Sequence, residues 1–208
     1  MNYIVGLGNP DEHYKETRHN IGRAIVQKFA QKNKFPDFEY DKRLNALISE
    51  GEYEYIPAGR KTKKKVAATL ILPETYMNKS GDAIKKIVGS KKKIEDMTLI
   101  YDDLDLGLGV VKMNFNRGSG GHKGIDSIIR SLKSKKFNRL RVGISRLTPS
   151  GKVKKPKGDE AVIKHVLGKF SPSEQLKVKN IVNRSVDGLE LILKEGRIKA
   201  TNSFNKSR

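Results

Sequence analysis

The sequence has 208 residues and no cysteine, with 43 lysines and arginines against 23 aspartates and glutamates. The missing cysteines exclude a disulfide scaffold, a thiolate metal site and a cysteine nucleophile. Neither a membrane-length apolar run nor a signal-peptide pattern is present, so we expect a cytoplasmic protein without membrane association. The formal charge of +20 favours a polyanionic partner, usually nucleic acid, over charge that only maintains solubility.

Strand and helix patterns alternate along the first half of the chain. Residues 2–7 are β-branched and predict a strand, and from Ile21 apolar residues recur at helical spacing. Strands are expected over 44–51 and 66–72, with a hairpin around the sequence GEYEY and a basic loop between them. A helix is expected over 80–89, with Ser80 as its N-cap. A buried strand over 96–103 ends in carboxylates.

The second half continues the same alternation. Strands are expected over 109–115 and 137–145, with a helix between them that follows a glycine-rich loop. A long basic loop covers 148–159, and a capping box from Ser171 to Glu174 begins the last helix. The pattern predicts a single-domain α/β sandwich with a twisted, mostly parallel mixed sheet flanked by helices. We expect this domain to span residues 1–199, followed by a polar, frayed tail over 200–208.

Four polar loops follow expected strand ends, and they read GNPDEHY, PETYMN, YDDLD and NRGSGGHKG. In open α/β sheets the ligand crevice lies beyond the carboxyl ends of the strands. We therefore expect these four loops, although scattered in sequence, to meet at one site.

The segment GLGNPDEHYKETRHNIG offers two alternatives for chemistry. Gly6 and Gly8 begin a dinucleotide-type fingerprint, but Asp11 occupies the place of its third glycine. The turn suits presentation of Asn9, or serves conformation alone. His19 stands just before a helix, where it is either a capping or packing residue or a general base. A base needs a supporting carboxylate, for which Asp102, Asp103 and Asp105 are candidates. The four histidines show no metal-ligand spacing, and we expect neither metal nor cofactor.

Five blocks of the sequence resemble the bacterial-type peptidyl-tRNA hydrolase family, from residue 3 to the last helix and in family order. They are GLGNPDEHYKETRHNIG, PETYMNKSG, YDDLDLGLGVVKMNFNRGSGGHKG, FNRLRVGI and VLGKFSPSE. The family cleaves the ester between a peptide and the 3′ ribose of tRNA, without a metal. The resemblance therefore implies a peptidyl-tRNA substrate, and we expect a monomer.

The resemblance also implies roles for individual residues. His19 matches the general base, Asp102 its supporting carboxylate, and Asn9 the residue that recognises the blocked peptide end. Four further positions match the family's substrate and tRNA contacts, namely Tyr14, Tyr76, Asn78 and Arg141.

One position departs from the family pattern. Lys123 follows His122 where relatives commonly have Asn, and lysine donates hydrogen bonds but cannot accept them. We expect Lys123 to contact a phosphate at the tRNA 3′ end or to point into solvent.

Two alternatives to the enzyme remain at this stage, a non-catalytic RNA-binding protein on the same fold and a nucleotide-dependent enzyme. Turnover of peptidyl-tRNA would separate the first from the enzyme, and stabilisation by a dinucleotide would reveal the second.

Overall fold

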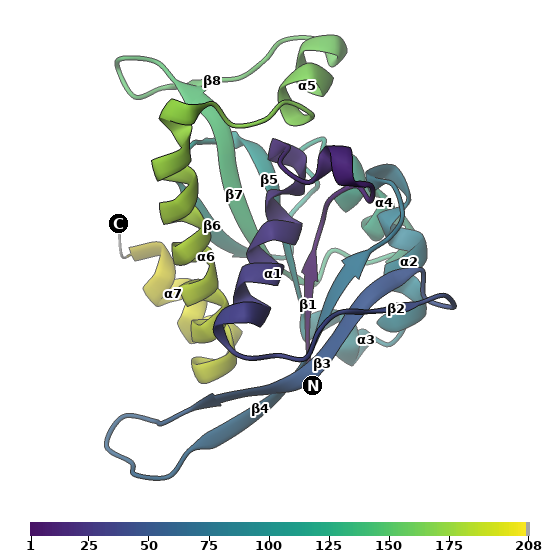
Figure 1. Ribbon diagram of the computed structural model, residues 1–208, viewed down its shortest axis with the longest axis vertical. Helices are drawn as coiled ribbons and strands as arrows, with labels where there is room; N and C mark the ends of the chain where they lie inside the picture. The colour runs from purple at the N-terminus through teal and green to yellow at the C-terminus, as the bar shows by residue number, and fades with distance from the viewer. Residues whose placement is uncertain (207–208) are drawn as a thin grey trace.

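The computed structural model describes residues 1–206 and has three layers, with one mixed sheet between two layers of helices (Figure 1). The sheet runs in the order β2-β3-β4-β1-β5-β7-β6, and β8 pairs with β7. Its strands are β1 (Asn2–Gly6), β2 (Glu39–Asp41), β3 (Ala46–Tyr55), β4 (Lys64–Pro73), β5 (Met97–Gly107), β6 (Val111–Phe115), β7 (Asn138–Leu147) and β8 (Val153–Lys154). The helices are α1 (Ile21–Lys32), α2 (Ser80–Ile87), α3 (Lys91–Glu95), α4 (Lys123–Leu132), α5 (Asp159–Val166), α6 (Gln175–Glu195) and α7 (Arg197–Lys206).

Strands β4, β1, β5 and β7 are parallel, whereas β2, β3, β6 and β8 pair antiparallel at the edges. The expected fold class is confirmed. Parallel strands are covered by helices on both faces, which is why β1 and the first six residues of β5 are almost continuously buried. Helices α1 and α6 pack on one face, and α2 and α4 on the other.

Two local predictions in the first half were placed wrongly. The sequence GEYEY lies inside β3, and the connecting loop covers residues 56–63, because β3 and β4 pair in register up to Tyr55 and Lys64. Ser80 does not cap α2. A 3-10 turn over Met77–Lys79 precedes the helix, and the buried Ser80 hydroxyl donates to the Met77 carbonyl at 2.9 Å.

The C-terminal segment also differs from the expected frayed tail. Residues 197–206 form α7, whose Ala200 and Phe204 are buried against the sheet side of α6. The Asn205 side chain holds this helix on β6 by accepting from the Met113 amide and donating to its carbonyl. Three tertiary anchors thus order a polar sequence that has little helical signal of its own. Residues 207–208 of the predicted tail lie outside the described residues. Across residues 1–206 no helix combines the length and apolarity needed to cross a membrane.

Candidate active site

The four polar loops meet at one cavity of about 580 Å³ beyond the carboxyl ends of β1 and β5. Each loop contributes side chains to its wall, and α5 closes one side with apolar residues. The lining includes Asn9, His19, Tyr76, Met77, Asn78, Lys79, Asp102, Ser119, Gly120, Gly121, His122, Lys123, Val162, Ile163, Val166 and Leu167. The convergence predicted from strand ends is therefore present in the structure.

Two histidines converge on one carboxylate oxygen at this cavity. His19 Nδ1 lies 2.8 Å from Asp102 Oδ1, and His122 Nε2 lies 3.1 Å from the same oxygen. Asp102 is only 2% exposed, so hydrogen bonds from these two rings, rather than from water, stabilise its negative charge. Because His19 donates through Nδ1, its Nε2 keeps a lone pair, and His19 lines the cavity. This arrangement can take a proton from a bound water.

Asp102 stays ionised despite its burial. Burial by itself would raise the pKa of this carboxyl, but the two imidazoles of His19 and His122 outweigh burial through their charges and hydrogen bonds. The pKa of Asp102 is therefore held far below its usual range. A carboxylate that stays ionised beside His19 can stabilise an imidazolium at that position.

His122 is fixed in one tautomer by the start of α4. Its Nδ1 accepts from the backbone amides of Gly124 and Ile125, at 3.2 and 3.3 Å, as the N-cap of the helix. The ring proton therefore resides on Nε2 and points to Asp102. His19, Asp102 and His122 are close enough to form a metal-binding group, with candidate ligand atoms within 4.8 Å of one another. A metal at His122 Nε2 would have to displace that proton, so the donor set fits a hydrogen-bonded base better than a metal centre.

Close packing of α1 on the sheet brings His19 to Asp102, 83 positions away. A Cβ on Gly22 would lie 2.3 Å from the Ile100 carbonyl oxygen, so only glycine allows this approach of α1 to β5. Arg18 fixes the same segment from the other side by donating to Glu174 Oε2 at 2.8 Å and to the Lys169 carbonyl at 2.6 Å. Glu174 is also the acidic member of the predicted capping box, which the structure confirms.

The glycine turn presents Asn9, as the sequence suggests. Its backbone amide and carbonyl pair with the Asn20 side chain, both at 2.9 Å, and its Oδ1 accepts from the Met77 amide at 2.8 Å. The Asn9 amide NH₂ remains available at the cavity wall. Asn78 and Lys123 are exposed at the cavity.

The two tyrosines differ in their relation to the cavity. Tyr76 lines it, is 53% exposed, and donates to Asp11 Oδ2 at 3.1 Å. Tyr14 is outside the lining and half-buried, with its ring 3.9 Å from that of His13.

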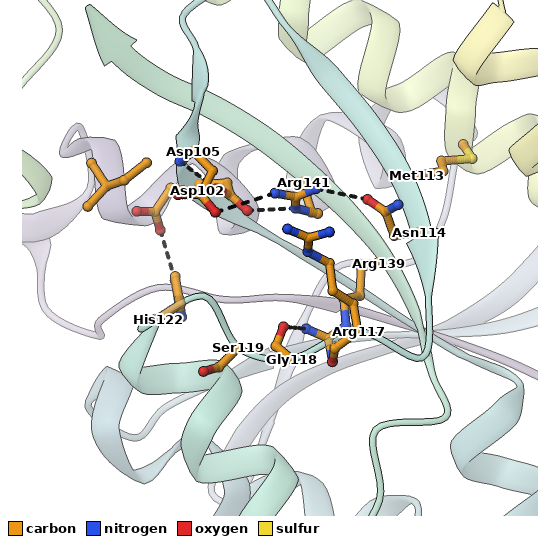
Figure 2. A network of polar contacts seen from close by, with 12 residues as sticks. Asp102, Asp105, Met113, Asn114, Arg117, Gly118, Ser119, His122, Arg139 and Arg141 are labelled. Carbon is orange, nitrogen blue, oxygen red and sulfur yellow. Dashed lines mark hydrogen bonds and ion pairs between the residues drawn. The ribbon is translucent and has the colours of Figure 1, made fainter. Parts of the chain in front are cut away.

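Arg141 is held inside the fold by an acidic and an amide partner. It is 4% exposed, and its Nε donates to Asp103 Oδ2 at 2.6 Å while Nη1 donates to Asn114 Oδ1 at 3.0 Å (Figure 2). These contacts hold the Arg141 guanidinium beside Asp103, a residue of the cavity wall, and its contact with tRNA stays a prediction. Lys155 contacts Asp105, so neither Asp103 nor Asp105 is the carboxylate that meets His19.

The family model for peptidyl-tRNA hydrolase matches residues 3–208. The chain belongs to the peptidyl-tRNA hydrolase family. It is 35% identical over 207 residues to the peptidyl-tRNA hydrolase of Syntrophotalea carbinolica, covering 99% of this chain and 97% of that protein. Its identity to the enzyme of Thermodesulfovibrio yellowstonii is 37% over 209 residues, covering 99% and 100%. The fold matches a crystal structure of peptidyl-tRNA hydrolase from Acinetobacter baumannii with a TM-score of 0.81 at 28% identity, covering 99% and 94%.

Family membership makes this chain an enzyme that hydrolyses peptidyl-tRNA. Sequence reasoning did not single out four residues: Arg18, which fixes the segment before α1, Asn20, which pairs with Asn9, His122, which meets Asp102, and the buried Arg139. The patterns did signal His122, since it follows two glycines and directly precedes an apolar-periodic helix. Nothing local signalled Arg18 or Arg139, because their partners are backbone carbonyls and a carboxylate far along the chain.

Proposed function

We propose that His19 is the general base that activates water for hydrolysis of the peptidyl-tRNA ester, and that Asp102 supports it. The contact between His19 Nδ1 and Asp102 Oδ1 at the cavity carries this proposal. In the reaction, His19 Nε2 takes a proton from water as the oxygen attacks the ester carbonyl. The proton then passes to the departing 3′ oxygen of the ribose, which regenerates neutral His19.

Asn9 and Asn78 are suited to bind the peptide backbone beside the ester. With Oδ1 of Asn9 occupied by Met77, its NH₂ group is the part left to donate to a peptide carbonyl. The apolar wall from α5, which includes Val162 and Val166, suits peptide side chains. Lys123, at the first turn of α4, adds a cation where the helix N-terminus already favours an anion such as a 3′-terminal phosphate.

The distribution of ion pairs indicates where the acceptor arm binds. Residues 79–96 and 123–136, around α2, α3 and α4, carry eleven exposed cations and four acidic residues. We call these cations the basic face: Lys79, Lys85, Lys86, Lys91, Lys92, Lys93, Lys123, Arg130, Lys133, Lys135 and Lys136. Within residues 1–206 none of the eleven is in an ion pair, whereas the surface pairs lie elsewhere, at Lys15, Lys32, Lys63, Lys65, Lys155, Lys169 and Lys194. Because Lys79 and Lys123 also line the cavity, we propose that the acceptor arm lies along this face.

The test compares two triple variants of the purified protein. Lys85→Gln, Lys86→Gln and Arg130→Gln together remove three charges from the basic face, and each lost phosphate contact should reduce the salt slope of tRNA affinity by about 1. The control variant removes three exposed cations from α1 and α6, at Lys28, Lys177 and Lys179, and should change the slope little. If both triple variants reduced the salt slope equally, the proposed binding of the acceptor arm along the basic face would be contradicted.

Turnover of N-acetyl-aminoacyl-tRNA by the wild-type chain tests the chemistry itself. Hydrolysis that His19→Ala abolishes while tRNA binding persists supports the general-base role. Binding without turnover by the wild type would favour a non-catalytic RNA-binding protein. We further propose that the protein acts in the cytoplasm, since translation in that compartment releases the substrate. We also propose that it is a monomer and needs no metal. Size-exclusion chromatography tests the oligomeric state, and activity in the presence of a chelator tests the metal requirement.

A further inference from the structure

Two arginines of β7 are buried side by side in the interior, Arg139 and Arg141 (Figure 2). Side chains alternate along a strand, so both face the α4 side, while Leu140 and Val142 face the core under α1 and α6. Arg139 is only 1% exposed and is the largest fully buried side chain of residues 1–206. Arg141 is neutralised by Asp103, but Arg139 is in no ion pair in that range.

The guanidinium of Arg139 is satisfied by a loop rather than by an acid. Nη1 donates to the Gly118 carbonyl at 2.7 Å, and Nη2 donates to the Arg117 carbonyl. The flat side of the group lies over the Phe137 ring, 4.5 Å from its centroid. Burial of an unpaired charge is costly, and Nε of Arg139 has no hydrogen-bond partner. A hydrophobic residue would fill this position at lower cost, which points to a function for the two carbonyl contacts.

Those contacts anchor the glycine-rich loop that leads into the active site. The loop covers residues 116–121 and has no regular secondary structure, with left-handed φ values of +51° at Asn116, +64° at Gly120 and +82° at Gly121. Ser119, Gly120 and Gly121 line the cavity directly before His122. An irregular loop of this kind needs outside donors to fix its carbonyl groups. Arg139 supplies two donors at the start of the loop, at the two residues directly before Ser119, where the cavity lining begins.

A packed side chain connects the same arginine to the carboxylate. Tyr101, adjacent to Asp102 in β5, is 1% exposed and meets the His122 ring edge-on at 5.0 Å. Burial raises the pKa of the Tyr101 phenol, and the neighbouring Arg139 partly opposes this rise. Arg139, Tyr101 and His122 thus form a continuous layer beneath Asp102.

We propose that Arg139 is a positioning residue for hydrolysis, because it holds the 116–121 loop where His122 can donate to Asp102. This inference rests on the proposed role of Asp102 as the support for His19. Without the two carbonyl contacts the loop moves and carries His122 off the Gly124 and Ile125 amides that fix its tautomer, and Asp102 then accepts from His19 alone.

The experiment uses Arg139→Met, Arg139→Lys and a control, Asn138→Ala. Methionine fills the site without donors, and lysine retains the charge but not the forked pair of donors. The control removes a neighbouring buried side chain that donates to the Glu95 carbonyl at 3.3 Å rather than to a carbonyl of the loop. Steady-state hydrolysis of N-acetyl-aminoacyl-tRNA is measured together with nitrogen-15 NMR of the histidine rings, which distinguishes the two neutral tautomers without requiring turnover.

We expect Arg139→Met to lower kcat by tenfold or more with KM within about threefold, since one hydrogen bond to a charged group is lost at Asp102. In the wild type, His122 shows the tautomer with its proton on Nε2, and in Arg139→Met its signals become those of a mixture. Arg139→Lys recovers part of kcat and part of the wild-type tautomer signal, and Asn138→Ala leaves kcat and the His122 tautomer unchanged.

Three outcomes would overturn the proposal. One is a kcat in Arg139→Met that falls only in proportion to the unfolded fraction. Another is an unchanged His122 tautomer in a folded variant. The third is failure of both Arg139 variants to fold, which would make the guanidinium a determinant of the whole fold. Failure of the proposed function is separate, because it would appear as absent hydrolysis by the wild type while the His122 signals remain readable.

Discussion

Replacement of Asp102 by Asn tests the centre of the mechanism with a minimal change of shape. The carboxylate receives hydrogen bonds from His19 and His122 on a single oxygen. Asparagine keeps the size of the side chain but removes the negative charge, and it presents either a weaker acceptor or an NH₂ group to His19. In the second orientation, His19 would adopt the tautomer that places its proton on Nε2, where it cannot accept one from water.

The expected loss follows from the geometry of this pair. The Nδ1–Oδ1 distance of 2.8 Å places the two charge centres about 4 Å apart once His19 is protonated, where unit charges attract by about 4 kcal/mol at an effective dielectric constant of about 20. A neutral amide oxygen recovers about 1 kcal/mol through its hydrogen bond. The difference of about 3 kcal/mol corresponds to a fall in kcat of about 10²-fold.

The assay is steady-state hydrolysis of N-acetyl-aminoacyl-tRNA, with tRNA affinity measured separately. We expect KM to stay within about threefold, because Asp102 lies beneath His19 and is 2% exposed. Asp103→Asn is an instructive comparison, since Asp103 contacts Arg141 instead of His19. A kcat of Asp102→Asn within threefold of the wild type, in a folded protein, would refute the general-base assignment. So would a larger loss in Asp103→Asn.

Three further predictions concern the same cavity and its stability. His19→Ala should lower kcat by about 10²–10⁴-fold and leave tRNA affinity unchanged, as filter binding and turnover together can establish; near-normal turnover would exclude His19 as the base. Lys123→Asn should raise KM severalfold with kcat nearly constant if Lys123 contacts a phosphate. Unchanged KM and kcat would show that the Lys123 side chain does not contribute to substrate binding. Because the folded-state pKa of Asp102 lies below its unfolded value, the ionised group stabilises the fold above about pH 4, and this contribution is lost as the pH falls further. Urea unfolding from pH 5 to pH 3 should therefore show a shallower decline for Asp102→Asn than for the wild type.

The sequence by itself determined the elements whose pattern is local. The apolar spacing from Ile21, the β-branched run before Gly6 and the Ser171–Glu174 capping box each specify their own structure through side chains a few positions apart. Strand ends also predicted that Asn9, Asn78 and Asp102 would share a cavity with His122. The sequence patterns did not predict α5, which directly follows the long basic loop although its own eight residues contain one lysine and no proline. Local signals also failed for α7, which depends on anchors from β6 and α6.

The environment of β7 was decided by the tertiary structure alone. The alternation in RLRVGI places Leu140 and Val142 in the core and by itself leaves Arg139 and Arg141 on an outer face. That face is buried as well, because β7 lies between β5 and β6 and the 116–121 loop covers it. The tertiary structure also decided the pairing of His19 with Asp102. Proximity between residues 83 positions apart depends on the close approach of α1 to β5 at Gly22, a contact that no local pattern encodes.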